Sequence, residues 1–193
     1  MIENKMLVTH TSRTGKTYLL HSGPKRDGGV QHFFSTRATG NLADRLPEGF
    51  EIYEAVGGQV FLRREQPKLI RDSERDIVSQ WLQQNHPRHR YKIEVRAKTL
   101  TIHENGNPIE ASERFGRIFS RQDLADMAGR FASYQAVLRF ILTDPVRRLF
   151  APERFCFRGS VDDWISVGPP ESIDKIAAKH LKHLGRNSLF ELY

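Results

Sequence analysis

The sequence predicts an α+β fold in which antiparallel β-sheet units are combined with about three helices. Three observations favour this class. Apolar runs on both sides of Gly57-Gly58 predict a hairpin over residues 50–64, because tight two-residue turns need positive φ. Alternating apolar and polar residues predict a second hairpin over 90–104, and apolar residues recur at helical spacing over 173–184. Hairpin-connected strands beside helices are typical of the α+β class rather than of parallel sheets.

The N-terminal part of the chain is expected to be all β. Residues 1–14 are predicted to form a flexible arm. Two further short strands are predicted, at 16–21 and 30–35. Together with the Gly57-Gly58 hairpin they predict a small antiparallel unit of four strands over 15–66. A two-residue turn implies a register in which Tyr53 lies opposite Leu62.

Residues 67–193 are predicted to form an α+β domain with the element order α-ββα-ββα. The first helix is expected to begin near Asp72 or Ser73, either of which can cap it, and to stop at His86-Pro87. Ser120 with Asp123 resembles a capping box and predicts a short middle helix over 120–131.

The C-terminal part is expected to add two strands and the last helix. Strong strand patterns cover 134–143 and 149–157. The helix over 173–184 has the clearest apolar stripe in the chain, and Gly185 suits the position that follows a helix. The apolar residues 189–193 are expected to dock as a strand.

Composition indicates a globular protein with a basic N-terminal half. The 193 residues carry a net charge of +7, and 27% of them are charged. Residues 1–100 hold 17 Lys or Arg against 11 Asp or Glu. Such an excess favours an anionic partner, either nucleic acid or an acidic protein surface.

Several classes of protein are disfavoured by the sequence. Cys156 is the single cysteine, so no internal disulfide forms and a reducing compartment is expected. No apolar run approaches the roughly 18 residues of a membrane span, and the N-terminus has no secretory h-region. We therefore expect a cytoplasmic protein without a membrane partner. Gly15-Lys16-Thr17 matches the end of a phosphate-binding loop, but His10 stands where that motif needs Gly, so no cofactor is expected.

A longer segment carries a resemblance. The run HFFSTRATGNLADRLPEGFEIYEAVGGQVFLRREQPKLI, followed by YQAVLRFILTD, ERFCFRGSVDDWISVG and KHLKHLG, resembles a family of uncharacterised bacterial proteins. The resemblance covers most of the chain and implies a compact bacterial domain. It implies no activity, ligand or catalytic residue.

The densest group of charges lies over residues 86–98, with five Lys or Arg and two His against Glu94 alone. Lys and Arg neutralise phosphates, so we expect a nucleic-acid-binding face. Its predicted contact residues are Arg63, Arg64, Lys68, Arg88, Arg90, Lys92, Arg96 and Lys98. The same pattern also fits a solvated surface with charges at the ends of elements. Strand alternation places Tyr91 on the buried face rather than on a binding face.

Two alternatives stay open beside a non-enzymatic nucleic-acid-binding module. The first is a protein-interaction or oligomerisation module, such as a homodimer, that uses open edges of a small sheet. The second is a metal-dependent nuclease that uses Glu94 or the pair Asp162/Asp163. His180 and His183 are spaced to contact one metal ion on a helix, but two ligands do not specify a site. We therefore assign no metal site and no catalytic residue, and a non-enzymatic role is favoured.

Overall fold

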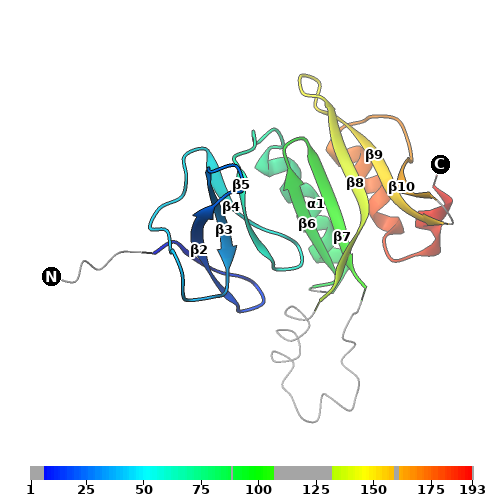
Figure 1. The fold of residues 1–193 in the computed structure, drawn as a ribbon. Coiled ribbons are helices and arrows are strands. Elements are labelled where there is room, and N and C mark those ends of the chain that lie inside the picture. Colours follow the sequence, from blue (N-terminus) through cyan, green and yellow to red (C-terminus); the bar gives the residue numbers. More distant parts are fainter. Residues whose placement is uncertain (1–6, 88, 107–131, 159–160, 193) are drawn as a thin grey trace, which may run out of the picture. The chain divides into compact units, whose positions relative to one another are not determined.

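The computed structural model describes residues 7–87, 89–106, 132–158 and 161–192 (Figure 1). These residues fall into two compact units, the first over 7–65 and the second over 66–106 and 132–192. Both units contain antiparallel sheets, and the second also contains two α-helices. The α+β class predicted from the sequence is therefore confirmed.

The first unit holds a three-stranded sheet and a separate hairpin. The sheet has the order β1-β2-β3, with strands β1 (Thr9–Thr11), β2 (Thr17–Pro24) and β3 (Val30–Ser35). The hairpin is formed by β4 (Phe50–Glu54) and β5 (Val60–Arg64). The four predicted strands are present as β2, β3, β4 and β5, but they belong to two sheets rather than to one four-stranded unit. The additional strand β1 lies within the segment expected to be a flexible arm. This segment is held by Glu54, whose carboxylate lies 2.9 Å from His10 Nε2 and accepts a 2.9 Å hydrogen bond from the Arg13 N–H.

The β4–β5 hairpin differs from the predicted register by one residue. Tyr53 pairs with Phe61 rather than with Leu62. The Gly58 N–H donates to the Ala55 carbonyl at 2.7 Å, and φ of Gly58 is +82°. The connection therefore uses one left-handed glycine at a bulge, not two in a two-residue turn.

The second unit is a five-stranded antiparallel sheet with the order β10-β9-β8-β7-β6. Its strands are β6 (Tyr91–Arg96), β7 (Thr99–Asn105), β8 (Tyr134–Asp144), β9 (Leu149–Arg158) and β10 (Val161–Ser166). The helices α1 (Asp72–Asn85) and α3 (Ile173–His180) cover the same face of the sheet (Figure 1). The core lies between the sheet and the two helices. Its most buried members include Val78, Leu100, Ile102, Leu138, Phe140, Phe150, Ile176 and Leu181.

Helix α1 begins and ends as predicted, but its capping residue differs from the prediction. The His86 N–H donates to the Leu82 carbonyl at 3.0 Å and closes the last turn. The residue that caps the start is Arg71, not Asp72 or Ser73. Its backbone N–H is satisfied by the Glu74 carboxylate at 2.8 Å, and its carbonyl accepts a 3.1 Å hydrogen bond from the Glu74 N–H, so the first turn is closed without a short polar side chain at the cap.

The C-terminal segment is helical rather than extended. The predicted helix over 173–184 divides into α3 and a 3₁₀ turn, η1 (Leu181–His183). A second 3₁₀ turn, η2 (Asn187–Glu191), replaces the strand expected at the end of the chain. Buried Arg154 holds this segment by donating to the carbonyls of Phe190 and Leu192, at 3.2 and 3.3 Å. The middle helix predicted over 120–131 lies outside the described residues.

Neither α1 nor α3, the α-helices found in the described part of the chain, is long and apolar enough to cross a membrane.

Candidate nucleic-acid interface

The predicted phosphate contacts are distributed over both units. Arg63 and Arg64 lie on β5 of the first unit, and five others lie in the second unit. Arg88 lies outside the described residues. In the second unit, Arg90 and Lys92 are at the start of β6 and Arg96 is at its end. At the usual rise of a strand, Arg96 lies about 20 Å from Arg90 and about 13 Å from Lys92.

Lys98 and Lys68 share the end of the sheet that holds Arg96. Lys98 is in the β6–β7 turn, and its carbonyl accepts a 2.8 Å hydrogen bond from the Leu142 N–H near the end of β8. Leu69, which follows Lys68, accepts a 3.1 Å hydrogen bond from Arg148 in the β8–β9 turn. The sequence-predicted residues of the second unit therefore divide between two ends of one sheet.

Carboxylates compensate four of the predicted cations. The ion pairs are Arg63–Glu51 at 2.8 Å, Lys68–Asp72 at 2.8 Å, Arg90–Glu104 at 2.6 Å and Arg96–Glu94 at 3.0 Å. Each pair removes one positive charge from the local field. Lys68 and Asp72 are both exposed, and a pair of this kind is worth only about 0–1 kcal/mol, so a phosphate can compete for Lys68. The other three pairs are half-buried on at least one side.

The start of β6 gains further cations from a distant part of the sequence. Lys182 and Arg186 are exposed at the end of η1 and lie beside His183. Burial lowers the pKa of His183, and Lys182 and Arg186 lower it further. Burial also lowers the pKa of His86, helped by Arg90 and Arg186 and opposed by Glu104. We call the group Arg90, Lys182, His183, Arg186 and His86 the basic end. Of these five residues, only Arg90 was predicted from the sequence to contact phosphates.

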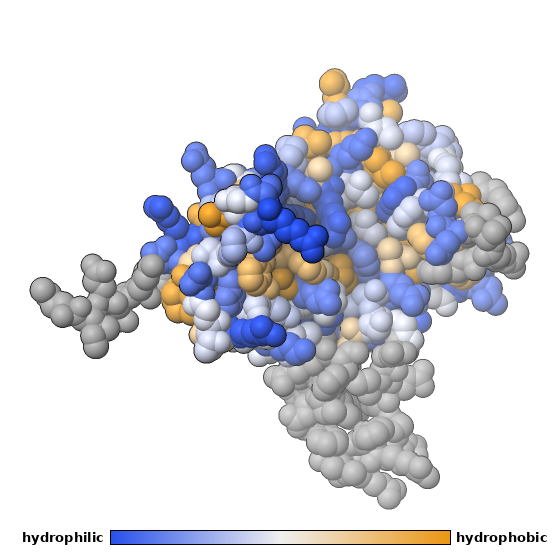
Figure 2. Space-filling model, in the orientation of Figure 1, coloured by the Kyte–Doolittle hydropathy of each residue, from blue (hydrophilic) through white to orange (hydrophobic). Residues whose placement is uncertain are grey.

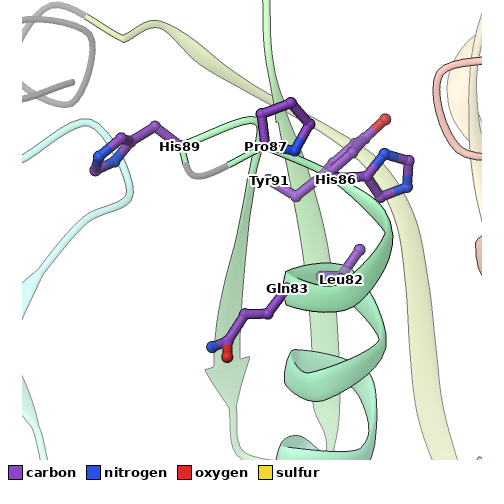
Figure 3. A pocket seen from close by; sticks show the side chains of 6 residues that line it. All are labelled: Leu82, Gln83, His86, Pro87, His89 and Tyr91. Atoms are coloured by element: carbon purple, nitrogen blue, oxygen red, sulfur yellow. The ribbon is translucent and has the colours of Figure 1, made fainter. Parts of the chain in front are cut away.

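The His86 imidazole is packed among aromatic rings. Its centroid lies 5.6 Å from that of Trp81 and 4.6 Å from that of Tyr91, with the Tyr91 ring edge-on. His86 Nε2 is buried and has no hydrogen-bond partner among the described residues. The His86 and Tyr91 rings lie close together in Figure 3.

Tyr91 is fixed by hydrogen bonding and by a close glycine. Its hydroxyl donates to Glu104 Oε1 at 3.2 Å, and Arg90 Nη2 donates to the same oxygen at 2.6 Å. Burial and the Glu104 charge raise the pKa of Tyr91 to about 12, so the hydroxyl remains a donor at neutral pH. A Cβ on Gly185 would lie 2.9 Å from the hydroxyl oxygen, and φ of Gly185 is +72°. This position therefore requires glycine.

A pocket of about 550 Å³ lies beside these rings at the end of α1. Its lining residues are Leu82, Gln83, His86, Pro87, His89 and Tyr91 (Figure 3). The Gln83 and His89 side chains extend to one side of the view, and the rings of His86 and Tyr91 lie on the other, with Pro87 between them. The pocket thus has a polar side and an aromatic side.

The carboxylates proposed for a nuclease are not brought together. Glu94 is on β6 and Asp162 and Asp163 are on β10, the two opposite edges of the sheet. Four strand spacings separate these edges, which is about 19 Å. Asp162 and Asp163 are adjacent residues of strand β10, so they project to opposite faces of the sheet.

The histidine pair on α3 and η1 has separate surroundings. His180 is buried, and its Nδ1 lacks a hydrogen-bond partner within the described ranges. His183 Nδ1 lies 2.9 Å from Ser188 Oγ. No group of three or more His, Cys, Asp or Glu side chains in the described part of the chain is arranged to hold a metal ion.

Comparison of the chain with protein-family models, with curated proteins and with solved structures finds no match. No relative therefore assigns a role to the basic end or to the pocket.

Proposed function

We propose that this chain is a non-enzymatic module that binds nucleic acid through its phosphates, with the basic end as the main contact. The observation that carries the proposal is the position of Gly185, where a Cβ would lie 3.8 Å from Arg90 Nη2, so that the neighbouring cation Arg186 is brought close to Arg90. In agreement with this, Arg90 and Arg186 both lower the pKa of His86, and Lys182 and Arg186 lower that of His183. Lys and Arg side chains neutralise phosphates and release the counterions that surround a nucleic acid.

Carboxylates and helix ends compensate much of this charge. Three cations less the Glu104 and Glu191 carboxylates leave one positive charge. Cations near a helix C-terminus also offset a partial charge of about −0.5. A phosphate therefore has to compete with Glu104 and Glu191 for these cations.

The sequence-predicted residues take different parts in this proposal. Arg90 and Lys92 stand at the start of β6 and are expected to contact phosphates. Arg96, Lys98 and Lys68 stand at the other end of the sheet, where Glu94 and Asp72 compensate two of them. We expect these three to contribute less to binding.

The test compares two double charge reversals that change the net charge equally. Binding of labelled single- and double-stranded DNA and RNA is measured at several salt concentrations for the wild type, for Lys182→Glu with Arg186→Glu, and for Lys68→Glu with Lys98→Glu. We expect the first pair to weaken binding and to lower the magnitude of the salt slope by about 1.4–1.8, because two phosphate contacts are lost. The second pair should change both quantities less.

Two results would contradict the proposal. Equal losses in both variants would mean that net charge alone, and not the basic end, governs binding. Absence of wild-type binding at low salt would remove nucleic acid as the ligand.

A protein-interaction module is the second candidate, and β3 is the observation that favours it. β3 is a terminal strand of its sheet among the described residues, and it exposes Val30 and Phe33 by 64% and 44%. Figure 2 shows groups of hydrophobic residues on the visible surface of the molecule, between hydrophilic ones. Open strand edges with apolar side chains can pair with another chain. Light scattering over a range of concentrations distinguishes a homodimer, which Val30→Lys should dissociate, from a monomer.

A further inference from the structure

The pocket at the end of α1 adjoins the basic end, because His86 belongs to both. We propose that this pocket takes one unpaired base of a nucleic-acid strand whose phosphates lie on the basic end. The inference rests on the proposed function and narrows its ligand to single-stranded nucleic acid.

The aromatic side of the pocket suits a flat ring. His86 and Tyr91 are held in place by their contact with each other and by the hydrogen bond from Tyr91 to Glu104. Leu82 and Pro87 add apolar surface. Every base has a π-face, so stacking on such side chains favours unpaired bases with little dependence on sequence.

The polar side offers hydrogen bonds to the edge of a base. Gln83 Nε2 donates to Ser79 Oγ at 3.1 Å, and this is the amide's single hydrogen bond among the described residues. Its second N–H and its carbonyl oxygen are therefore left for a ligand. A side-chain amide can donate to and accept from the same base edge.

His89 occupies a backbone position that would suit glycine. Its φ is +67°, and the Arg90 N–H donates to the Pro87 carbonyl at 3.2 Å across the turn. The Tyr134 hydroxyl donates to the His89 carbonyl at 2.9 Å and holds the strained residue in place. Because a glycine there would be unstrained, a histidine at the pocket indicates a use for its side chain.

Size and access favour a single strand over a duplex. The volume of about 550 Å³ lies within the range of small-ligand pockets and accommodates one base. A base inside a duplex has both faces stacked and its pairing edge occupied, so it must leave the helix before it can enter a pocket. Duplex phosphates can still contact the basic end without this step.

The experiment measures the affinity of the full chain for a labelled single strand and for the corresponding duplex at two salt concentrations. The pocket variants are Gln83→Ala and His89→Gly, and the control is Gln84→Ala, the exposed neighbour that does not line the pocket. We expect the wild type to prefer the single strand by at least about fivefold, the lower end of what stacking of one base supplies. Both pocket variants should reduce this preference and leave duplex affinity unchanged. His89→Gly relieves the positive φ, so its thermal stability should not fall, and lost binding cannot be assigned to unfolding.

The outcomes separate this inference from the proposed function. Salt-dependent binding with equal affinity for single strand and duplex would overturn the pocket and leave the phosphate contacts standing. A single-strand preference that both pocket variants retain would overturn it as well, because a base in this pocket must contact Gln83 and His89. Failure of the wild type to bind either form would overturn both proposals.

Discussion

Loss of Arg148 should destabilise the second unit through a carboxylate buried in α1. Arg148 lies in the β8–β9 turn, and its Nε donates to Glu74 Oε1 at 2.7 Å. Its Nη2 donates to the other oxygen of Glu74 and, at 3.1 Å, to the Leu69 carbonyl. The Glu74 and Arg148 side chains are 8% and 19% exposed. Arg148→Ala therefore leaves a buried carboxylate without its cation.

The magnitude follows from how far the pair is buried. Breaking a fully buried ion pair costs about 3–5 kcal/mol, and an exposed pair is worth about 0–1 kcal/mol. Because Arg148 reaches solvent in part, we expect Arg148→Ala to lower the free energy of unfolding by about 2–3 kcal/mol. Arg148 also has a φ of +55°, a backbone conformation that is strained for Ala but not for Gly. Arg148→Gly should therefore be less destabilising than Arg148→Ala by about 0.5–1 kcal/mol.

The same contact sets a pH dependence. Burial by itself raises the pKa of Glu74, but Arg148 and the Arg71 N–H outweigh it, so the pKa lies below its ordinary value of 4.5. A carboxyl with a lowered pKa contributes stability that is present above about pH 4.5 and is lost as the pH falls through the folded-state pKa. The difference in stability between the wild type and Arg148→Ala should therefore shrink below pH 4.5.

Urea unfolding followed by tryptophan fluorescence measures these effects. Trp81 and Trp164 are the two tryptophans of the chain, and both lie in the second unit. The variant should show a lower midpoint with an unchanged m value at pH 7. A loss of less than about 1 kcal/mol would refute the reasoning, because the pair would then behave as an exposed one. An equal loss at acidic pH would refute the part assigned to the Glu74 charge.

Two glycines give further predictions. Gly58→Ala should destabilise the first unit by about 2 kcal/mol in thermal unfolding followed by circular dichroism, because φ is +82° and the new Cβ would lie 2.7 Å from Thr14 Cγ2. Gly49→Ala is the control for backbone strain alone, since φ is +72° there with no atom within 4 Å, and an equal loss would exclude crowding. Gly185→Ala should cost about 2 kcal/mol in urea unfolding, from positive φ and a displaced Tyr91 hydroxyl. It should also lower the pKa of Tyr91 from about 12 toward 10 in an absorbance titration, and an unchanged pKa would mean that the hydroxyl had not moved.

Elements specified by local pattern could be predicted from the sequence. The β6–β7 hairpin turns at Ala97-Lys98, where alternation on both sides implied it, and Ala97 has the positive φ that such a turn needs. Helix α1 stops before Pro87, because proline disfavours a helical conformation in the residue before it. In each case the residues that specify the structure are neighbours in sequence.

Features that depend on distant contacts could not be predicted. Strand β1 forms in a polar segment that Glu54, more than forty residues away, fixes through His10 and Arg13. The residue that caps α1 was not predicted, because Glu74 serves the backbone of Arg71 and the guanidinium of Arg148 at once. The general preference for Asp or Ser at a helix start takes no account of a carboxylate that is held by a distant arginine.

The candidate site illustrates how charge sums in space rather than along the chain. The run over 86–98 suggested a continuous basic face, yet Glu104 compensates Arg90 and Glu94 compensates Arg96. Further positive charge at the start of β6 comes instead from Lys182, in η1, and from Arg186, just after it. Two basic residues near the end of the last predicted helix were the available sequence signal, but they indicated no partner until Arg186 was known to lie near His86 at the end of α1. A phosphate at this end would therefore be held by cations from both halves of the second unit. Reversing the charge of Lys182 and Arg186 tests whether binding depends on the basic end or on the run over 86–98 alone.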